Sequence, residues 1–191
     1  MSDMRRLLFA LVLSACAGCL TASRPLPVAE WLVDCKVAAD GSRDPKFGVA
    51  RFSQLAVRAP YDALQFAVLR ADGTVAFDDY NRFAAAPSQL LKGAVLDVLK
   101  GSGLFRSVVG SSSAATADLT VEVTVERLCL DCRAPDARRA RAAVSLLLLD
   151  RSRTIMAEIS GESSSDAAAG NYAEAFASAL SGALEVALGR L

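Results

Sequence analysis

The sequence predicts an α+β domain, built as a mixed, largely antiparallel sheet with two main helices packed on one face. Three observations predict this class. Short apolar runs broken by turn residues fill 47–77, strand-like runs follow one another through 118–160, and apolar residues recur at helical spacing in two later segments. The order is strands, a helix, a strand, three antiparallel strands and then a helix, which is typical of an α+β domain.

The first strands are short and separated by turn signals. A strand is expected at Trp31–Val33, and a longer one at 47–58, which Ala59-Pro60 ends. The run 64–70 is the next strand. Asp72-Gly73 then supplies the positive φ angles of a tight hairpin turn, so that 75–77 returns as its partner.

The first main helix starts at Pro87-Ser88 and stops at Gly101-Ser-Gly103. A short strand over 104–109 follows it. The apolar residues of the helix fall at the i, i+3, i+4, i+7 spacing of one face: Leu90, Leu91, Ala94, Val95, Val98 and Leu99.

Three strands and a final helix complete the pattern. Residues 118–126 alternate apolar with polar, 142–149 are nearly all apolar, and 155–160 alternate again. Residues 129–138 are expected to be the connection between the first two of these strands. Asp166 is expected to cap the last helix, whose apolar stripe is Tyr172, Phe176, Ala179, Leu180, Ala183, Leu184, Ala187 and Leu191.

The N-terminus has the order of a lipoprotein export signal. Arg5-Arg6 precede an uncharged apolar run, which ends in Leu13-Ser14-Ala15-Cys16. The run is shorter than the about 20 apolar residues that span a bilayer. The sequence therefore predicts a signal peptide at 1–15, a lipidated tether at 16–30 that begins with acylated Cys16, and a single periplasmic domain at 31–191. Cys19, after Ala17-Gly18, is the alternative attachment site, but it would place a cysteine where leucine is usual.

Composition argues against several classes of function. The chain has no histidine, which removes the commonest general base and zinc ligand. We therefore expect no catalytic residues, no metal and no cofactor. Removing residues 1–15 leaves 19 basic and 20 acidic residues, because Arg5, Arg6 and Asp3 are lost from 21 of each. A net charge of about −1 gives no reason to expect a nucleic-acid partner.

Four cysteines remain after Cys16: Cys19, Cys35, Cys129 and Cys132. An even number in an oxidising compartment permits disulfides, and Cys129-Leu-Asp-Cys132 is the nearest candidate pair, although the pairing of all four stays open. Idle thiols are the alternative. A redox role is disfavoured because Asp131 lies inside the motif and the motif ends a strand-like run.

Three stretches carry a resemblance, in this order along the chain: Phe52–Tyr61, Phe66–Arg70 and Leu90–Phe105. They resemble the ABC-type transport auxiliary lipoproteins of the PqiC-like group, which accompany MCE-type lipid transporters. Phe52–Tyr61 resembles that family's first long strand and the bend after it, and Phe66–Arg70 its next strand. Leu90–Phe105 resembles its helix. Phe83 stands where the family tends to have tryptophan, and Ala85 where it tends to have an acidic residue.

The resemblance implies a non-catalytic lipoprotein of the outer membrane that faces the periplasm. It would serve an ABC/MCE-type transporter of lipids or other hydrophobic substrates, with an MCE-domain protein or the ABC complex as partner and the membrane contacted through the lipid anchor. A homo-oligomer is left open. Ala17, rather than aspartate, after Cys16 agrees with outer-membrane sorting. A lipoprotein for envelope assembly or cell-wall synthase activation is the alternative, and a carboxylate enzyme is a further one.

Two groups of residues are candidates for a partner surface, and each also has a simpler structural interpretation. The aromatic group could equally close the end of a core. The arginine group could contact anionic headgroups or an acidic partner, or it could belong to an ordinary solvated loop. Asp78-Asp79 reads as a solvated turn rather than a catalytic pair. The candidates are Tyr61, Tyr80 and Phe83 for the aromatic group, and Arg138, Arg139 and Arg141 for the basic group.

Overall fold

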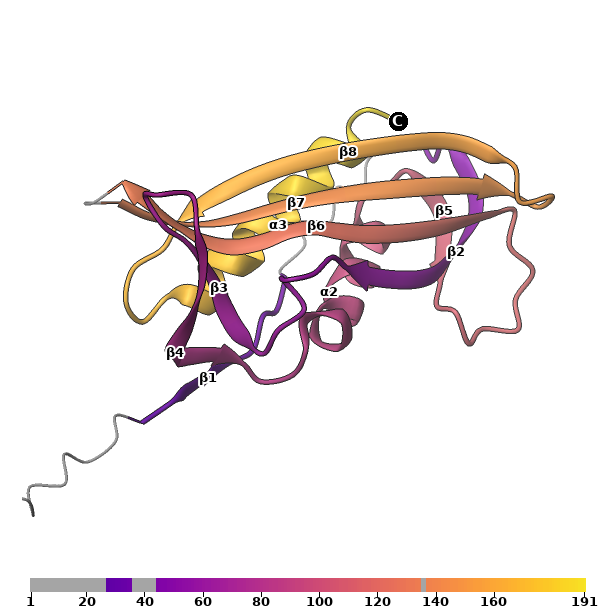
Figure 1. Cartoon of the computed structure of the whole chain (residues 1–191). Coiled ribbons are helices and arrows are strands. Elements are labelled where there is room, and N and C mark those ends of the chain that lie inside the picture. Colours follow the sequence, from indigo (N-terminus) through magenta and orange to yellow (C-terminus); the bar gives the residue numbers. More distant parts are fainter. Residues whose placement is uncertain (1–26, 36–43, 135–136) are drawn as a thin grey trace, which may run out of the picture.

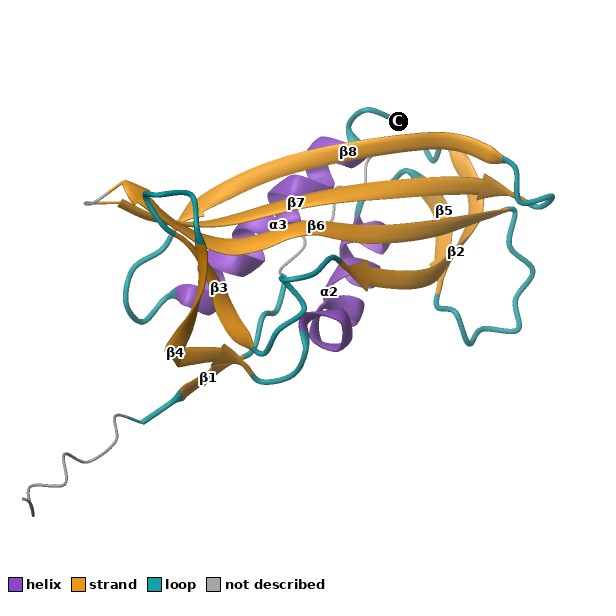
Figure 2. Cartoon of the chain, viewed as in Figure 1, coloured by secondary structure: helices purple, strands orange, loops and turns teal. Residues whose placement is uncertain are grey.

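The computed structural model describes residues 27–35, 44–134 and 137–191. All eight strands of this part of the chain belong to one sheet, and both of its helices pack on the same face of that sheet (Figures 1 and 2). The elements are β1 (Ala29–Trp31), β2 (Phe47–Val57), β3 (Gln65–Leu69), β4 (Val75–Phe83), α2 (Pro87–Gly101), β5 (Phe105–Val109), β6 (Leu119–Ala134), β7 (Ala137–Asp150), β8 (Ile155–Asp166) and α3 (Tyr172–Leu188).

The strand β6 organises the sheet. One of its edges pairs with β7, which pairs in turn with β8, so these three long strands form an antiparallel meander. The other edge of β6 is shared: its first half pairs with β2, over Leu119–Val125, and its second half pairs with β3 at Leu130 and Asp131. The sheet therefore divides into two arms beside β6, with β2 and β5 in one and β3, β4 and β1 in the other.

The predicted fold class, a mixed sheet with two main helices on one face, is confirmed. The antiparallel part is the meander with the β3–β4 hairpin, whereas the other four of the seven strand pairings are parallel: β1–β4, β2–β5, β2–β6 and β3–β6. Parallel neighbours arise because the chain crosses over the sheet between the paired strands, a long-range feature that local alternation does not report.

Two local predictions are wrong. Residues 129–134 and 137–138 are strand rather than connection, because β6 continues to Ala134 and β7 begins at Ala137. Charged side chains occupy these strand ends because they pair across them, as Asp131 does with Arg141. Asp166 caps no helix: it ends β8 and pairs with Arg139 at 3.3 Å, and α3 begins only at Tyr172.

The helix α3 and the strand β8 lie so close together at Gly161 that there is no room for a side chain there. A Cβ added to Gly161 would lie 2.1 Å from the backbone oxygen of Ala183, and one added to Gly182 would lie 2.6 Å from Ser163 Oγ. The alanine-rich face of α3 is buried against β7 and β8. The two helices and the inner face of the sheet thus enclose one cluster of packed apolar side chains.

Candidate functional site

The proposed lipid attachment site, Cys16, and its alternative, Cys19, lie outside the described residues. The described chain begins at Pro27 and enters the sheet as β1 two residues later, next to β4 (Figure 1). Of the helices described, neither is long and apolar enough to cross a membrane.

Of the two alternatives for Cys129 and Cys132, a disulfide or idle thiols, the structure has the thiols. Both residues lie on β6 as free thiols. Residues three apart in a strand are about 10 Å apart, whereas a disulfide needs Cα atoms within about 7 Å. Burial raises the pKa of the Cys129 thiol to about 11 and raises the pKa of Cys132 as well. Cys35 is also a free, buried thiol, with Sγ 3.7 Å from the backbone oxygen of Ala177.

The three aromatic candidates do not form one surface. Phe83 is only 1% exposed and packs in the core, with its ring 4.6 Å from that of Phe66 and 5.2 Å from that of Phe176. Its assignment to a partner surface is therefore wrong, because its position on β4 faces inward. Tyr61 lies in the bend after β2 and packs half-buried against the core, whereas Tyr80, on β4, is 51% exposed.

Asp78, the first of the two neighbouring carboxylates, has a structural role. Its carboxylate accepts hydrogen bonds from the backbone N–H groups of Tyr80 and Asn81 and from the Asn81 side chain. Among residues 27–35, 44–134 and 137–191, no three Cys, Asp or Glu side chains lie close enough together to hold a metal ion.

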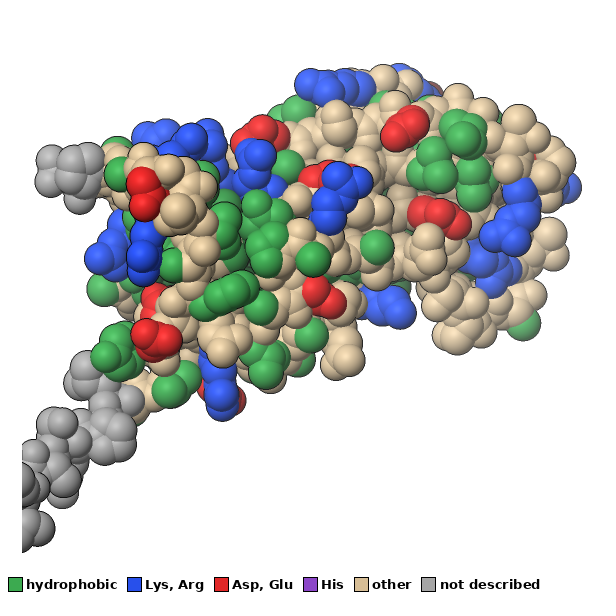
Figure 3. Space-filling model, viewed as in Figure 1, with side chains coloured by type: hydrophobic (Ala, Val, Ile, Leu, Met, Phe, Trp, Pro, Cys, Tyr) green, Lys and Arg blue, Asp and Glu red, His purple; other side chains and the backbone are tan. Residues whose placement is uncertain are grey.

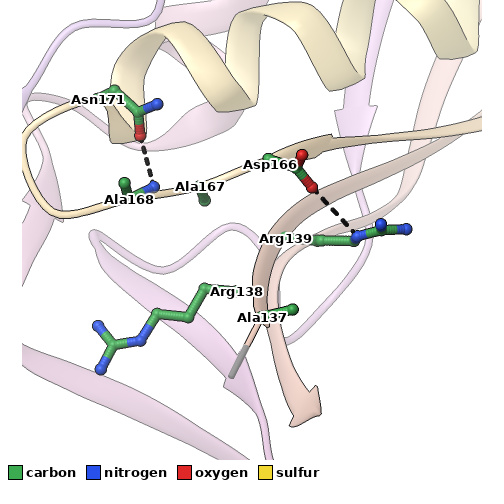
Figure 4. A pocket seen from close by; sticks show the side chains of 7 residues that line it. All are labelled: Ala137, Arg138, Arg139, Asp166, Ala167, Ala168 and Asn171. Atoms are coloured by element: carbon green, nitrogen blue, oxygen red, sulfur yellow. Dashed lines mark hydrogen bonds and ion pairs between the residues drawn. The ribbon is translucent and has the colours of Figure 1, made fainter. Parts of the chain in front are cut away.

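The arginine candidates are brought together, but on two faces of one strand. Arg139 and Arg141 both lie on the open face of β7. Arg138 lies on the opposite face of the strand, together with buried Ala140, and α3 covers that face. Figure 4 shows Arg138 and Arg139 pointing in opposite directions from the strand. Arg139 borders a surface pocket of about 390 Å³ on one side and, with Arg141, another of about 500 Å³.

Asp131 organises the arginines on the open face, and its role was not anticipated from the sequence. Its carboxylate accepts two hydrogen bonds from Arg133, at 2.9 and 2.7 Å, and lies 3.3 Å from Arg141. The hydrogen bond from Arg133, with the charge of Arg141, lowers the pKa of Asp131 to about 2. The carboxylate therefore stays ionised and offsets part of the positive charge.

Arg138 connects the hairpin to the first strand. Its guanidinium donates to the Tyr172 hydroxyl at 3.1 Å, and the Tyr172 ring lies 5.5 Å from the Trp31 ring in an edge-to-face arrangement. The indole N–H of Trp31 donates in turn to Asn81 at 3.0 Å. The β6–β7 hairpin, the start of α3, β1 and β4 therefore meet at one end of the domain, which we call the near end.

The near end also carries an apolar surface that the sequence analysis missed. Burial alternates over 31–35, where Trp31, Val33 and Cys35 are turned inward, whereas Val28 and Leu32 are exposed by 46% and 68%. In the parallel register, Glu30 lies beside Arg82 and forms an ion pair with it, and Val28 and Tyr80 each come one position before the first paired residues, Ala29 and Asn81. We call these five residues the β1–β4 face: Val28, Glu30, Leu32, Tyr80 and Arg82.

Exposed large apolar side chains concentrate in this part of the molecule. Nine such side chains are described. Three of them lie on β4, two lie on either side of β1, and one precedes β3. Figure 3 shows apolar side chains where the described chain begins and basic side chains around the β6–β7 hairpin. Inward and outward positions alternate over 31–35, and a strand prediction limited to 31–33 was too short to reveal this pattern. The six are Val28, Leu32, Leu64, Val75, Phe77 and Tyr80.

Comparison with known proteins shows a shared fold. A Xanthomonas campestris protein described under family model DUF330 is similar over 87% of this chain and 91% of its own, with a TM-score of 0.58 and 15% identity. A second, uncharacterised protein matches over 78% of this chain and 90% of its own, with a TM-score of 0.54 and 13% identity. At such identities the likeness concerns the fold alone.

A weaker likeness is to a PelC dodecamer from Paraburkholderia phytofirmans, with a TM-score of 0.42 and 11% identity over 78% of this chain and 93% of that one. No family model matches the chain, and no curated protein matches it either.

Proposed function

We propose that the protein is a non-catalytic lipoprotein of the outer membrane, anchored through acylated Cys16, with its domain facing the periplasm. It acts as an auxiliary or adaptor component of an ABC/MCE-type transporter of lipids or other hydrophobic substrates. The observation that carries the proposal is the lipobox Leu13-Ser14-Ala15-Cys16, which stands at the end of a basic and then apolar leader.

Two further observations support the adaptor role. The α+β fold is shared with the DUF330 protein of X. campestris, which is consistent with the family resemblance in Phe52–Tyr61 and Leu90–Phe105. The space between the sheet and the helices is filled by packed side chains, of which Leu91, Val95 and Phe176 have no exposed surface. With its interior filled, the domain would contact a partner or a hydrophobic substrate through its surface.

The anchoring part is tested by mass spectrometry of the mature protein from membranes. We expect a triacylated N-terminal Cys16 and no peptide from residues 1–15. Acylation at Cys19, or a free N-terminus in the soluble fraction, would contradict it. Two chains or more are needed for stable membrane attachment, so a Cys16→Ser variant should leave the outer-membrane fraction.

The adaptor part is tested by co-purification of the acylated protein from detergent-solubilised envelopes. We expect an MCE-domain protein or an ABC transporter subunit to co-purify with wild type, and deletion of the gene to increase sensitivity to detergents. Specific recovery of a cell-wall synthase without any transporter component would favour the envelope-assembly role instead. A hydrolase or transferase activity in the purified protein would overturn the non-catalytic assignment.

A further inference from the structure

The β1–β4 face is an exposed apolar surface next to the point where the described chain begins. Leu32 is 68% exposed, Tyr80 51% and Val28 46%. They surround the Glu30–Arg82 ion pair, in which the two opposite charges offset each other. Scattered single apolar residues need no explanation, but a cluster that shares one two-stranded face indicates a contact surface.

The distance to the proposed anchor decides which contact this surface reaches first. Val28 lies twelve positions after Cys16 in the sequence. A chain of that length spans at most about 40 Å, even when fully extended. The β1–β4 face is thus held within one short linker of the lipid surface, and such a linker gives an effective concentration on the order of millimolar. A weak affinity for lipid is sufficient for contact under these conditions.

The chemistry of the near end fits a membrane interface. Tyrosine presents an apolar ring and a polar hydroxyl, and it is enriched where acyl chains meet headgroups. Arginine places its apolar stem along such a surface while its guanidinium reaches phosphate. The near end supplies Arg133, Arg138, Arg139 and Arg141 from the hairpin that contacts β1 through Tyr172. Asp131 and Asp166 offset part of this charge, so the apolar residues carry more of the contact.

We propose that the β1–β4 face lies against the phospholipid surface of the membrane that holds the anchor, with the arginines of the β6–β7 hairpin beside it at the headgroups. The proposal rests on the proposed anchoring through Cys16. In this orientation the long strands point away from the bilayer, and the β7–β8 turn at their other end projects into the periplasm. The acyl chains and the domain surface would then fix orientation together, whereas acyl chains alone leave the domain free to rotate.

The chain contains a native probe for this contact. Trp31 is the only tryptophan and lies on β1, between Glu30 and Leu32, with its partly buried indole turned inward behind the β1–β4 face. The acylated full-length protein is reconstituted into phosphatidylcholine vesicles with one-fifth of the lipid, roughly, as phosphatidylglycerol, and with or without brominated phosphatidylcholine. We expect Trp31 fluorescence to be quenched by the brominated lipid and to fall further when phosphatidylglycerol is present.

A matched pair of double variants separates docking from mere tethering. Leu32→Ser with Tyr80→Ser removes the two most exposed apolar side chains of the face and should weaken docking roughly tenfold. Ile155→Ser with Met156→Ser removes side chains that are 60% and 54% exposed at the other end of the domain, and should leave the quenching unchanged.

Each result decides one of the two proposals. An acylated protein whose Trp31 is not quenched, or is quenched equally in wild type and in the Leu32/Tyr80 variant, overturns the docking proposal and leaves the anchor intact. A variant that loses self-association in detergent while its quenching is unchanged assigns the face to a second copy and also overturns it. If Cys16 is not acylated, the anchoring proposal fails and the docking proposal fails with it.

Discussion

The two ends of the long strands are held together in different ways. At the near end, Phe66, Phe83, Phe176, Tyr172 and Trp31 form a continuous set of aromatic contacts, with ring centroids 4.6 to 5.8 Å apart. The opposite end, which we call the far end, consists of β5, residues 110–118 and the β7–β8 turn (Figure 1). Its contacts are mainly hydrogen bonds between charged side chains and backbone groups.

Three side chains account for most of the far end. Arg51 donates to the backbone oxygens of Ser113, at 2.7 Å, and Ala115, at 2.5 Å, and so holds the segment before β6. Asp118 accepts the Val49 amide at 2.8 Å and pairs with Arg151. Asp150 accepts the Thr154 amide at 2.8 Å within the β7–β8 turn, where Arg153 has a φ of 66°.

This difference indicates a division of labour. Polar groups at the far end are used up in shaping turns, because a backbone group that turns away from the sheet needs a partner. At the near end the aromatic cluster supplies most of the packing, which leaves the exposed apolar side chains of the β1–β4 face available for contact, beside arginines that Asp131, Asp166 and Tyr172 hold in place. The near end is therefore where we expect function to be located, and the following predictions test the contrast.

The largest effect is expected from the aromatic cluster. Phe66→Ala should lower the free energy of unfolding by about 3–5 kcal/mol, because it leaves a cavity and removes three ring contacts. Phe105→Ala at the far end removes one ring contact, with Phe47 at 5.7 Å, and should cost about 1–2 kcal/mol less. Urea unfolding of both variants measures this. Equal losses of unfolding free energy in the two variants would show that aromatic packing is no more important at the near end than at the far end.

A smaller effect concerns the pH dependence at the near end. The pKa of Asp131 is about 2 in the folded protein and about 3.9 in an unfolded chain. A lowered folded pKa means that the stabilisation is complete above about pH 5 and is lost as the pH falls toward 2. With solvent screening, we expect about 1 kcal/mol from this group.

Asp131→Asn tests this by urea unfolding at several pH values. The variant should be less stable than wild type at pH 7, and the difference should shrink toward pH 2. The stability of the variant should still fall somewhat as the pH is lowered, because hydrogen bonds also lower the pKa values of Asp118 and Asp150, which both proteins contain. Asp166→Asn, which changes a carboxylate side chain that is 90% exposed, is the control and should have little effect. A constant difference between wild type and Asp131→Asn would contradict the prediction.

The contrast also shows what could be predicted from the sequence. The helix at 87–101 and the alternating start of β6 were predicted correctly, because an element that is buried on one side has apolar residues at regular intervals in its sequence. The end of β6 and the start of β7 were not. Asp131, Arg139 and Arg141 look like loop residues, and only the pairing of Asp131 with Arg139 across the strands makes them strand residues.

The candidate site could be predicted only in part for a related reason. The arginines were found because they cluster in the sequence. Phe83 was misplaced because an aromatic residue near a strand end reads the same whether it faces the core or the solvent. Leu32 and Tyr80 are 48 positions apart in the sequence and share a surface only through the parallel β1–β4 pairing. Such pairings have no local signature, so this face required the structure.

A local effect is expected at the far end. Asp118→Ala removes the acceptor of the Val49 amide and the partner of Arg151. The Val49 amide should exchange with solvent roughly tenfold faster, as measured by NMR hydrogen exchange. Amides of β3 and β4 at the near end should keep their rates, because they lie in the other arm of the sheet. Faster exchange throughout the molecule would show that the two ends are not independent.

The smallest effect is expected from the cysteines of β6. Cys129 and Cys132 are free thiols, so a reducing agent should leave the melting temperature unchanged. The thiolate is the reactive form, and the pKa of buried Cys129 is raised to about 11, whereas Cys132 is only partly buried. Iodoacetamide at pH 8 should therefore modify Cys132 well before Cys129 in the folded protein, and both at similar rates in urea. Mass spectrometry distinguishes the two sites, and a peptide that links them would restore the disulfide that the strand geometry excludes.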